Sequence, residues 1–343
     1  MALQTAALLI LAQNYAGDII RQINRRSVAL ALLAKKPGEG KNVAWAAQSS
    51  GAVAEAYAEG ADAASFAADA QSSAIIPWSF YRSNFSVSGF AKAAARTSRT
   101  PEGNIELIAR DIVDASAALS DQLNKHIYTG QSGQTPGQIV GFDEAIGLTN
   151  NTYATIDRTT NAFWRPYVAD PGVPTALTFA QIRLDLASIM KAGGVKPNVA
   201  LVGPETLNAV GALFDPQKLY TMQTTKVLGA EGMVELEGGI GAIKFDGCYF
   251  VEDKDATEGK IYYVNTDAAD VQYLPLDEPM MGGSDEMMET QAYDGFEEIP
   301  LGMRTEALAR TGDADKAMIK VYPQLRVRRP NQCGVRKNIN YTV

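Results

Sequence analysis

Residues that could carry catalysis are few in this chain of 343 residues. The single histidine, His126, excludes a histidine-rich metal site and leaves only one candidate for a hydrolytic triad. The chain has no Gly-x-x-x-x-Gly-Lys-Ser/Thr loop for phosphates. The glycines at 238–241 lack the further glycine of a dinucleotide loop, so we interpret them as a turn between strands. We therefore predict a protein that is not an enzyme and needs no cofactor.

The remaining reactive side chains have structural explanations. His126 lies near the end of a predicted helix, where pairing with the helix dipole explains it better than catalysis. Asp285, Glu286 and Glu289 could hold a divalent cation, but they lack EF-hand spacing and fit an acidic solvated loop better. The two distant cysteines cannot form a disulfide framework, which indicates a reducing, cytosolic place of synthesis.

The segment from Tyr153 to Tyr167 combines charge, amide and aromatic groups within a few residues. Arg158 and Arg165 could each bind a carboxylate with two hydrogen bonds, and Trp164 could bury a large face. This composition suits a contact between subunits. The alternative is a buried local turn in which Arg158 pairs with Asp157 or Asp143.

Charge is unevenly distributed along the chain, whose formal net charge is -8. Nucleic-acid binding by bulk electrostatics is therefore excluded. Basic residues gather near the start, Arg25 and Arg26 among them, and after Lys316, whereas residues 270–298 carry nine acids and no Lys or Arg. We expect these basic groups to meet acidic patches of neighbouring copies, such as residues 277–298, rather than DNA. Separate solvated faces remain the alternative.

The first hundred residues predict an arm and a hairpin. Residues 2–34 have helical spacing, and the apolar run at 6–12 is too short to span a membrane and has no basic residue before it. Residues 42–48 and 75–90 contain strand formers on either side of a stretch rich in Ala, Ser and Gly. We expect a long two-stranded arm between about 42 and 92 that lies on a neighbouring molecule, since such a hairpin is marginal alone.

A long helix and an α/β section follow. Residues 101–128 carry an apolar stripe after an N-cap at Thr100, which predicts a rod of roughly 40 Å. Thr178 and Gln181 form a capping-box pattern before the next helix, and residues 198–203 predict a buried strand. A second helix at 204–214, three strands at 241–251, 260–265 and 270–275, and alternating strands at 317–328 and up to 339 complete the prediction.

Three sequence segments, together with this order of elements, carry a resemblance. They are Ile156-Asp-Arg-Thr-Thr-Asn161 with Trp164-Arg165, Val195-Lys-Pro-Asn-Val-Ala-Leu-Val-Gly-Pro-Glu205, and Val321-Tyr-Pro-Gln-Leu325. The chain resembles the major capsid proteins of tailed bacteriophages, which have the Hong Kong phage type of capsid fold. The resemblance implies an α+β fold with an N-terminal arm at 1–40 and an extended E-loop hairpin at 41–98. It further implies a peripheral domain with a long spine helix at 99–150 and 300–343, and an axial α/β domain at 151–299.

The implied function is a shell protein that assembles into the icosahedral head around double-stranded DNA. Its partners would be copies of itself in pentamers and hexamers, a separate scaffolding protein or none, portal and decoration proteins, and DNA without sequence-specific contact, with no membrane. It would be made in the host bacterial cytoplasm and end in the virion. The alternatives are an encapsulin-like nanocompartment shell and a cytosolic α/β enzyme that binds an anion at a helix N-terminus. The residues predicted to lie between subunits are Arg25, Arg26, Trp45, Trp78, Phe80, Tyr81, Arg82, Phe85, Asp157, Arg158, Asn161, Trp164 and Arg165.

Overall fold

The computed structural model describes residues 28–50, 56, 59, 70–90, 103–134, 137–221, 233–236, 240–275, 304–308 and 312–341. Two compact units make up the chain. The first contains the described parts of Phe80–Leu123 and Tyr273–Pro323, and the second those of Ser27–Ser79, Asn124–Gln272 and Gln324–Val343. Several predictions lie outside the described residues: the helix at 2–27, the cap at Thr100, most of the hairpin tip, the acidic residues 285, 286 and 289, and Arg25 and Arg26.

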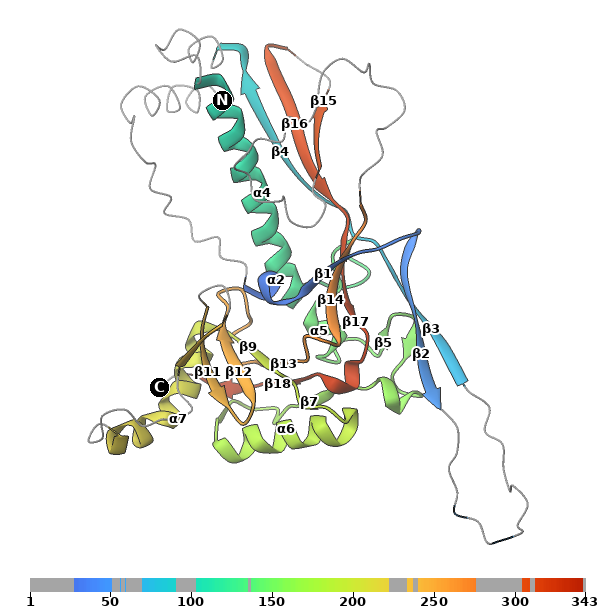
Figure 1. The fold of residues 1–343 in the computed structure, drawn as a ribbon, viewed down its shortest axis with the longest axis vertical. Helices are drawn as coiled ribbons and strands as arrows, with labels where there is room; N and C mark the ends of the chain where they lie inside the picture. Colours follow the sequence, from blue (N-terminus) through green and yellow to red (C-terminus); the bar gives the residue numbers. More distant parts are fainter. Residues whose placement is uncertain are drawn as a thin grey trace. The chain divides into compact units, whose positions relative to one another are not determined.

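The first unit is a three-stranded antiparallel sheet beside a long helix (Figure 1). The strands are β4 (Tyr81–Ser88), β15 (Arg304–Leu308) and β16 (Ala314–Val321), in the order β15-β16-β4. Helix α4 (Gly103–Thr129) confirms the predicted rod and continues into the second unit. Its stripe of Ala115, Leu119 and Leu123 is buried, as expected from helical spacing.

The predicted two-stranded arm is only partly right. Strand β2 (Asn42–Ser50) pairs with β3 (Ala70–Pro77), so the hairpin exists. The predicted second strand, 75–90, is in fact two strands: β4 leaves the hairpin and pairs with β16 along its whole length. Pro77, which lacks an N–H for a ladder, ends β3 and helps to explain the change of sheet.

The second unit is built on a seven-stranded sheet in the order β10-β11-β12-β9-β13-β18-β7. Strand β9 (Val199–Val202) is entirely buried, parallel to β12 and antiparallel to β13. Figure 1 shows α6 (Phe179–Gly193) running along this sheet, and its inner face joins the core through Ile182, Leu186 and Ile189. The other strands are β7 (Tyr167–Ala169), β10 (Met233–Leu236), β11 (Ile240–Phe245), β12 (Cys248–Glu252), β13 (Ile261–Val264) and β18 (Gly334–Arg336).

Several smaller elements surround this sheet. Strands β1 (Ala34–Pro37), β14 (Ala269–Tyr273) and β17 (Pro323–Val327) form a three-stranded sheet in the order β1-β14-β17. Two short pairs are β5 (Thr152–Tyr153) with β6 (Ile156–Asp157), and β8 (Thr175–Ala176) with β19 (Ile339–Asn340). The remaining helices are α2 (Val28–Leu32), α5 (Phe142–Ala145), α7 (Pro204–Thr221), η1 (Ala162–Trp164) and η3 (Pro330–Gln332).

The local signals of the α/β section are confirmed. Thr178 and Gln181 form the complete capping box of α6, and Gly194 ends the helix with φ of +76°. The buried strand at 198–203 is β9, and α7 is longer than predicted.

Three elements that were predicted as continuous are interrupted in the structure. The helix predicted up to 34 ends at Leu32, and β1 follows. The strand predicted at 241–251 is divided by a turn at Asp246 and Gly247, both at positive φ. The strand predicted at 317–328 ends at Val321, because Pro323 cannot continue a ladder, and β17 joins another sheet.

The described part of residues 324–343 clusters with the second unit, where β18 lies between β13 and β7. The expected division into arm, E-loop, peripheral domain and axial domain stays a prediction.

Candidate functional site

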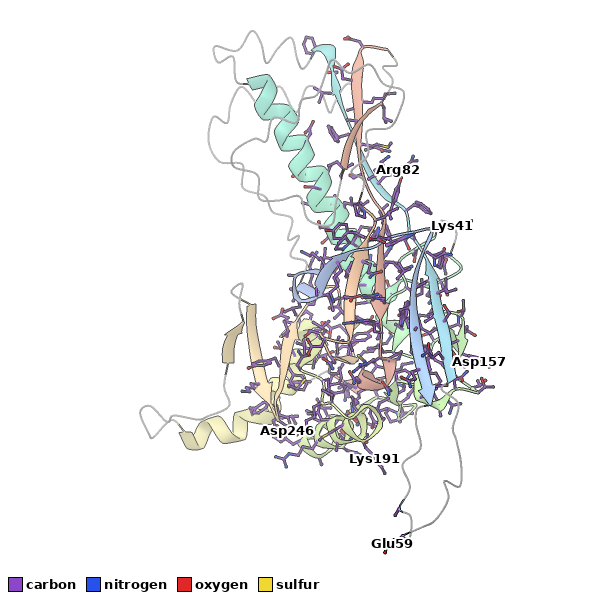
Figure 2. The ribbon with its side chains drawn as sticks, turned by 45° about the vertical axis from the view of Figure 1, so that its right-hand side comes forward. Lys41, Glu59, Arg82, Asp157, Lys191 and Asp246 are labelled. Carbon is purple, nitrogen blue, oxygen red and sulfur yellow. The ribbon has the colours of Figure 1, made fainter. Side chains whose placement is uncertain are left out.

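The segment from Tyr153 to Tyr167 begins as a tight hairpin. Ala154 and Thr155 connect β5 to β6 with φ of +52° and +67°, values that a β-branched residue such as Thr155 rarely adopts. Contacts with the long hairpin support this turn. The Ile75 N–H donates to the Ala154 carbonyl at 3.0 Å, and the Thr155 hydroxyl donates to the Ser73 carbonyl at 3.3 Å. The turn is therefore attached to β3, and Figure 2 shows Asp157 beside the β2–β3 hairpin.

Asp157 organises the next turn rather than binding Arg158. Its carboxylate accepts hydrogen bonds from the Thr159 N–H at 2.8 Å and from the Thr159 hydroxyl. These hydrogen bonds lower the pKa of Asp157, so its negative charge is favoured. The Asn161 side chain donates to the Asp157 carbonyl at 2.8 Å, and Arg165 donates to the Arg158 carbonyl. Asp, Thr and Asn thus shape a loop with local hydrogen bonds.

Three aromatic rings from distant parts of the sequence meet behind this loop. Trp45 of β2, Tyr153 of β5 and Trp164 of η1 have ring centroids between 6.2 and 6.4 Å apart. The Trp164 indole N–H donates to the Tyr153 carbonyl at 3.1 Å. Aromatic pairs at such separations stabilise a fold by more than the burial of their apolar surface alone would contribute. We call these three residues the aromatic cluster; it joins the hairpin to the loop.

Arg158 is buried next to the aromatic cluster, with only 1% of its surface exposed. Its guanidinium donates to the backbone carbonyls of Glu144, Ala145 and Asn150, and its Cζ atom lies 5.0 Å from the centroid of the Tyr153 ring. The alternative interpretation was a buried local turn in which Arg158 pairs with Asp157 or Asp143. That pairing is wrong, whereas Arg158 is buried within its own chain as the alternative expected. Burial lowers the pKa of Arg158 to about 10, so it keeps its charge at neutral pH.

The carboxylate of Asp143 already has other hydrogen-bond partners, so it does not pair with Arg158. It accepts hydrogen bonds from the Lys260 ammonium group at 2.8 Å and from the Tyr262 hydroxyl at 2.9 Å. Carbonyl oxygens therefore solvate Arg158, and it holds the main chain around α5 against the loop.

The C-terminal strand β17 completes the site. The Val327 N–H donates to the Tyr153 hydroxyl at 2.8 Å, and burial raises the pKa of Tyr153, which stays neutral. Gln324 accepts from the Val140 N–H at 2.9 Å and donates to the Pro77 carbonyl at 2.7 Å. Sequence reasoning missed Gln324 as a site residue, although it lies in the Val321–Leu325 segment that carried the resemblance.

Opposed charges also meet within the chain at this place. Arg326 forms two hydrogen bonds with the buried Asp270, at 2.8 and 2.7 Å, and its Cζ lies 6.0 Å from the Trp45 ring centroid. Lys36 and Arg328 lie 3.4 and 3.6 Å from the same carboxylate. Basic residues from both ends of the chain thus converge on one acid of their own chain, whereas the sequence had suggested neighbouring copies. The strand order β1-β14-β17, which the sequence does not show, brings these residues together.

The predicted site residues fall into four groups. Trp45, Arg158 and Trp164 meet in the second unit, with Asp157, Asn161 and Arg165 on the loop around them. Trp78 is buried beside Gly38 and donates to the Gly40 carbonyl at 3.0 Å. Phe80, Tyr81, Arg82 and Phe85 belong to the first unit. Arg25 and Arg26 lie outside the described residues.

The anion site required by the enzyme alternative is filled. At the N-terminus of α7, which follows the buried strand β9, the Glu258 carboxylate accepts from the Thr206 N–H at 2.9 Å and the Thr206 hydroxyl at 2.7 Å. A side chain in place of Gly203 would collide with Glu258. This position resembles an anion-binding helix end, but its ligand is a carboxylate of the same chain.

Other reactive groups in the described ranges are also engaged or inert. Cys248 and Cys333 are buried, and burial raises the pKa of both thiols, that of Cys333 to about 12. Across the same ranges no group of acids, cysteines and histidine could hold a metal ion. None of the described helices is long and apolar enough to cross a membrane.

One sequence family accounts for nearly the whole chain. The family described as SU10 major capsid protein matches residues 3–340. The chain belongs to the SU10 major capsid protein family. No curated protein sequence matches it.

Solved structures share the fold of this SU10-family protein at low identity. A capsid chain of cyanophage A-1(L) is 19% identical, with a TM-score of 0.71 over 97% of this chain and 99% of the other. The SrpI encapsulin of Synechococcus elongatus is 13% identical, with a TM-score of 0.57 over 98% and 96%. The capsid of a native GTA particle is 10% identical, with a TM-score of 0.59 over 95% of both chains.

The predicted fold class and function are thereby confirmed. The SU10-family protein has the α+β capsid fold of tailed phages and is a major capsid protein that self-assembles into a shell in the virion. Because encapsulins share the fold, the fold alone does not separate the two kinds of shell. The match to the SU10 major capsid protein family identifies the chain as a phage capsid protein and not as an encapsulin. The family is one of structural capsid proteins.

Proposed function

We propose that copies of this chain form the pentamers and hexamers of an icosahedral head that encloses the double-stranded DNA of a tailed phage, with each β2–β3 hairpin lying on a neighbouring copy. The observation that carries this proposal is the hairpin's chemistry. Neither β2 nor β3 contains a charged residue, and the β2 side chains at 42, 44, 46 and 48 are exposed. Exposed, uncharged strands associate unless charge or proline protects them.

The hairpin's inner face supports the same proposal. Val43 and Ile76 are paired and buried, and Trp45 belongs to the aromatic cluster, so this face is used within the chain. The outer face is left for a second molecule. We also propose that the aromatic cluster and Arg158 serve assembly indirectly, because they hold the hairpin at a constant angle while their own surfaces are buried.

A charge on the outer face of the hairpin tests this proposal. Purified Ala46→Glu, matched with Asn208→Glu on the exposed side of α7, would be examined by negative-stain microscopy and sedimentation velocity. We expect closed shells from the wild type and from Asn208→Glu, and unassembled folded subunits from Ala46→Glu. Normal shells from Ala46→Glu would contradict a hairpin contact.

The contents of the shell separate the two related functions. We expect shells from infected cells to contain nuclease-protected double-stranded DNA. Shells that contain protein cargo and no DNA would favour an encapsulin-like compartment. Synthesis in the host cytoplasm, a separate scaffolding protein, and portal and decoration proteins belong to the same proposal.

For Arg25 and Arg26 we retain the proposal of contacts with acidic patches of neighbouring copies. Reversing both to Glu should cause assembly that fails or becomes sensitive to salt, whether or not DNA is present. Normal assembly with poorer DNA retention would instead assign these residues to the genome.

A further inference from the structure

The outer side of helix α6 carries apolar side chains where a surface helix usually carries polar ones. Its inner side belongs to the core through Ile182, Leu186 and Ile189. On the opposite side, Leu184 is 60% exposed and Met190 is 49% exposed. Exposed apolar groups that gather on one side of an element indicate a surface for another molecule.

Two alanines lie between these larger side chains. Ala180 and Ala187 are both exposed and seven residues apart, about two helical turns, so they share one line along the helix. Leu184 and Met190 flank this line on either side. Small residues between larger ones form a groove into which the side chains of a second molecule can fit. We define Ala180, Leu184, Ala187 and Met190 as the α6 stripe.

The exposed charged groups of α6 are both positive. They are Arg183 and Lys191, and Figure 2 labels Lys191 on this helix. The acid of α6, Asp185, is buried and bonded to Arg336. Within the described part of the chain, no ion pair involves Arg183 or Lys191. The Cζ atom of Arg183 lies 5.5 Å from the Phe245 ring centroid, a contact that does not neutralise its charge.

We propose that the α6 stripe binds residues 277–298 of a second copy of this chain, an inference that rests on the proposed shell function. Charge complementarity selects this occupant. Residues 277–298 contain eight acids, no Lys or Arg, and four of the ten methionines of the chain. Methionine side chains adapt to irregular apolar surfaces, so they can cover the α6 stripe while the neighbouring carboxylates meet Arg183 and Lys191.

Two other occupants fit this surface less well. Packing of α6 against α6 of a second copy would bring Arg183 and Lys191 of both copies together, and like charges across an interface repel. Duplex DNA would satisfy the two cations, but its backbone presents phosphates and offers no apolar surface to cover Leu184.

Carbodiimide coupling tests the occupant with native side chains, since it joins an amine to a carboxylate that the amine contacts. Isotope-labelled and unlabelled subunits would be mixed before assembly, and coupled peptides mapped by mass spectrometry. We expect peptides that join Lys191 of one isotopic form to an acid within 277–298 of the other. Lys196 is the internal control, because its Nζ atom lies 3.0 Å from Asp246 and should couple within one chain.

Leu184→Glu supplies the functional measurement. It should raise the concentration needed for shell assembly by about tenfold or more, because the new carboxylate repels the acidic residues of the neighbour at every copy. Circular dichroism should show an unchanged fold, since Leu184 is exposed. Lys191→Glu, which changes only charge, should act in the same direction. Asn208→Glu adds the same charge on α7 and should assemble like the wild type.

The possible results separate the inference from the function on which it rests. Wild-type assembly by Leu184→Glu and Lys191→Glu, or coupling of Lys191 only within its own chain or to acids outside 277–298, overturns the inference. Normal shells that lose DNA would assign the α6 stripe to the genome and also overturn it. A wild-type chain that never forms shells would overturn the proposed function itself, and the inference with it.

Discussion

At the scale of the residue, Arg158 and Trp164 show how an interface-like composition can be used inside one chain. Both side chains are almost fully buried, at 1% and 3% exposure. A buried charge is costly unless hydrogen bonds compensate it, and three backbone carbonyls do so for Arg158. The same polar and aromatic residues that suit a subunit contact therefore attach the hairpin to its own unit.

Trp164→Ala should destabilise the subunit by about 3–5 kcal/mol, because it leaves a cavity between Trp45 and Tyr153. The neighbouring variant Phe163→Ala, at a half-buried position, should cost less. Urea unfolding of unassembled subunits measures both values. Equal effects from the two variants would contradict a special role for Trp164.

At the scale of the element, the short helix α2 is hydrogen-bonded to residues at and near the end of α4. Asn124 accepts from the Leu30 N–H at 3.2 Å, and its amide donates to the buried Asp253 at 3.0 Å. Asp253 also accepts from the Ala29 N–H and the Tyr128 hydroxyl, both at 2.9 Å. This network holds the first described residues of the chain against α4.

Asn124→Ala should loosen α2 selectively. The Leu30 N–H loses its acceptor, and an unsatisfied buried group costs about 1–3 kcal/mol. Hydrogen exchange should become faster at the amides of residues 29 and 30, while the core strand β9 stays protected. Lys125→Ala, at the exposed neighbouring position, is the control. Unchanged exchange in Asn124→Ala would show that α2 is held by apolar packing instead.

His126 should make stability sensitive to mild acid. Burial, and then the positive charge of Lys125, lower its pKa from the ordinary value of 6.5. The unfolded chain binds the proton more readily, so the contribution of His126 is present above about pH 6.5 and is lost as the pH falls through the folded pKa.

Unfolding of the wild type and of His126→Gln, measured from pH 7 downward, tests this sign. The variant should lose less stability than the wild type over the first part of the descent. Identical pH profiles would show that His126 does not couple to folding.

At the scale of the whole molecule, the second unit depends on the end of the chain. Strand β18 lies between β13 and β7, and its Arg336 forms two hydrogen bonds of 2.6 Å with the buried Asp185 of α6. The hydroxyls of Tyr167 and Tyr263 donate to the same carboxylate. The last residues thus complete a sheet whose other strands begin far earlier in the sequence.

Deleting residues 334–343 should therefore prevent the second unit from folding, since it removes an interior strand and leaves Asp185 without its cation. Deleting only residues 342 and 343 should have little effect. Circular dichroism and thermal unfolding distinguish the two. A cooperative transition in the longer deletion would contradict the interior role of β18.

The sequence alone was sufficient to predict those elements that depend on interactions between neighbouring residues. Helical spacing predicted the rod of α4, the pair Thr178 and Gln181 predicted the start of α6, and an apolar run predicted β9. Each of these signals depends on residues a few positions apart, so neighbouring side chains decide them. Residues 156–165 and the order of the elements carried the resemblance to the capsid family, which the family match over residues 3–340 confirms.

Only the tertiary structure decided which strands pair and which charges meet. Strand β4 joins β16 from more than two hundred residues away, and Lys36 and Arg326 reach Asp270 because β1, β14 and β17 share a sheet. Strand alternation specifies the faces of a strand but not its neighbour, because many pairings bury the same apolar face. Likewise, the sequence showed that Arg158 needed acceptors. Arg158 is buried against α5, where its acceptors are backbone carbonyls. Every residue has a backbone carbonyl, so no sequence pattern can show which carbonyls will serve as acceptors.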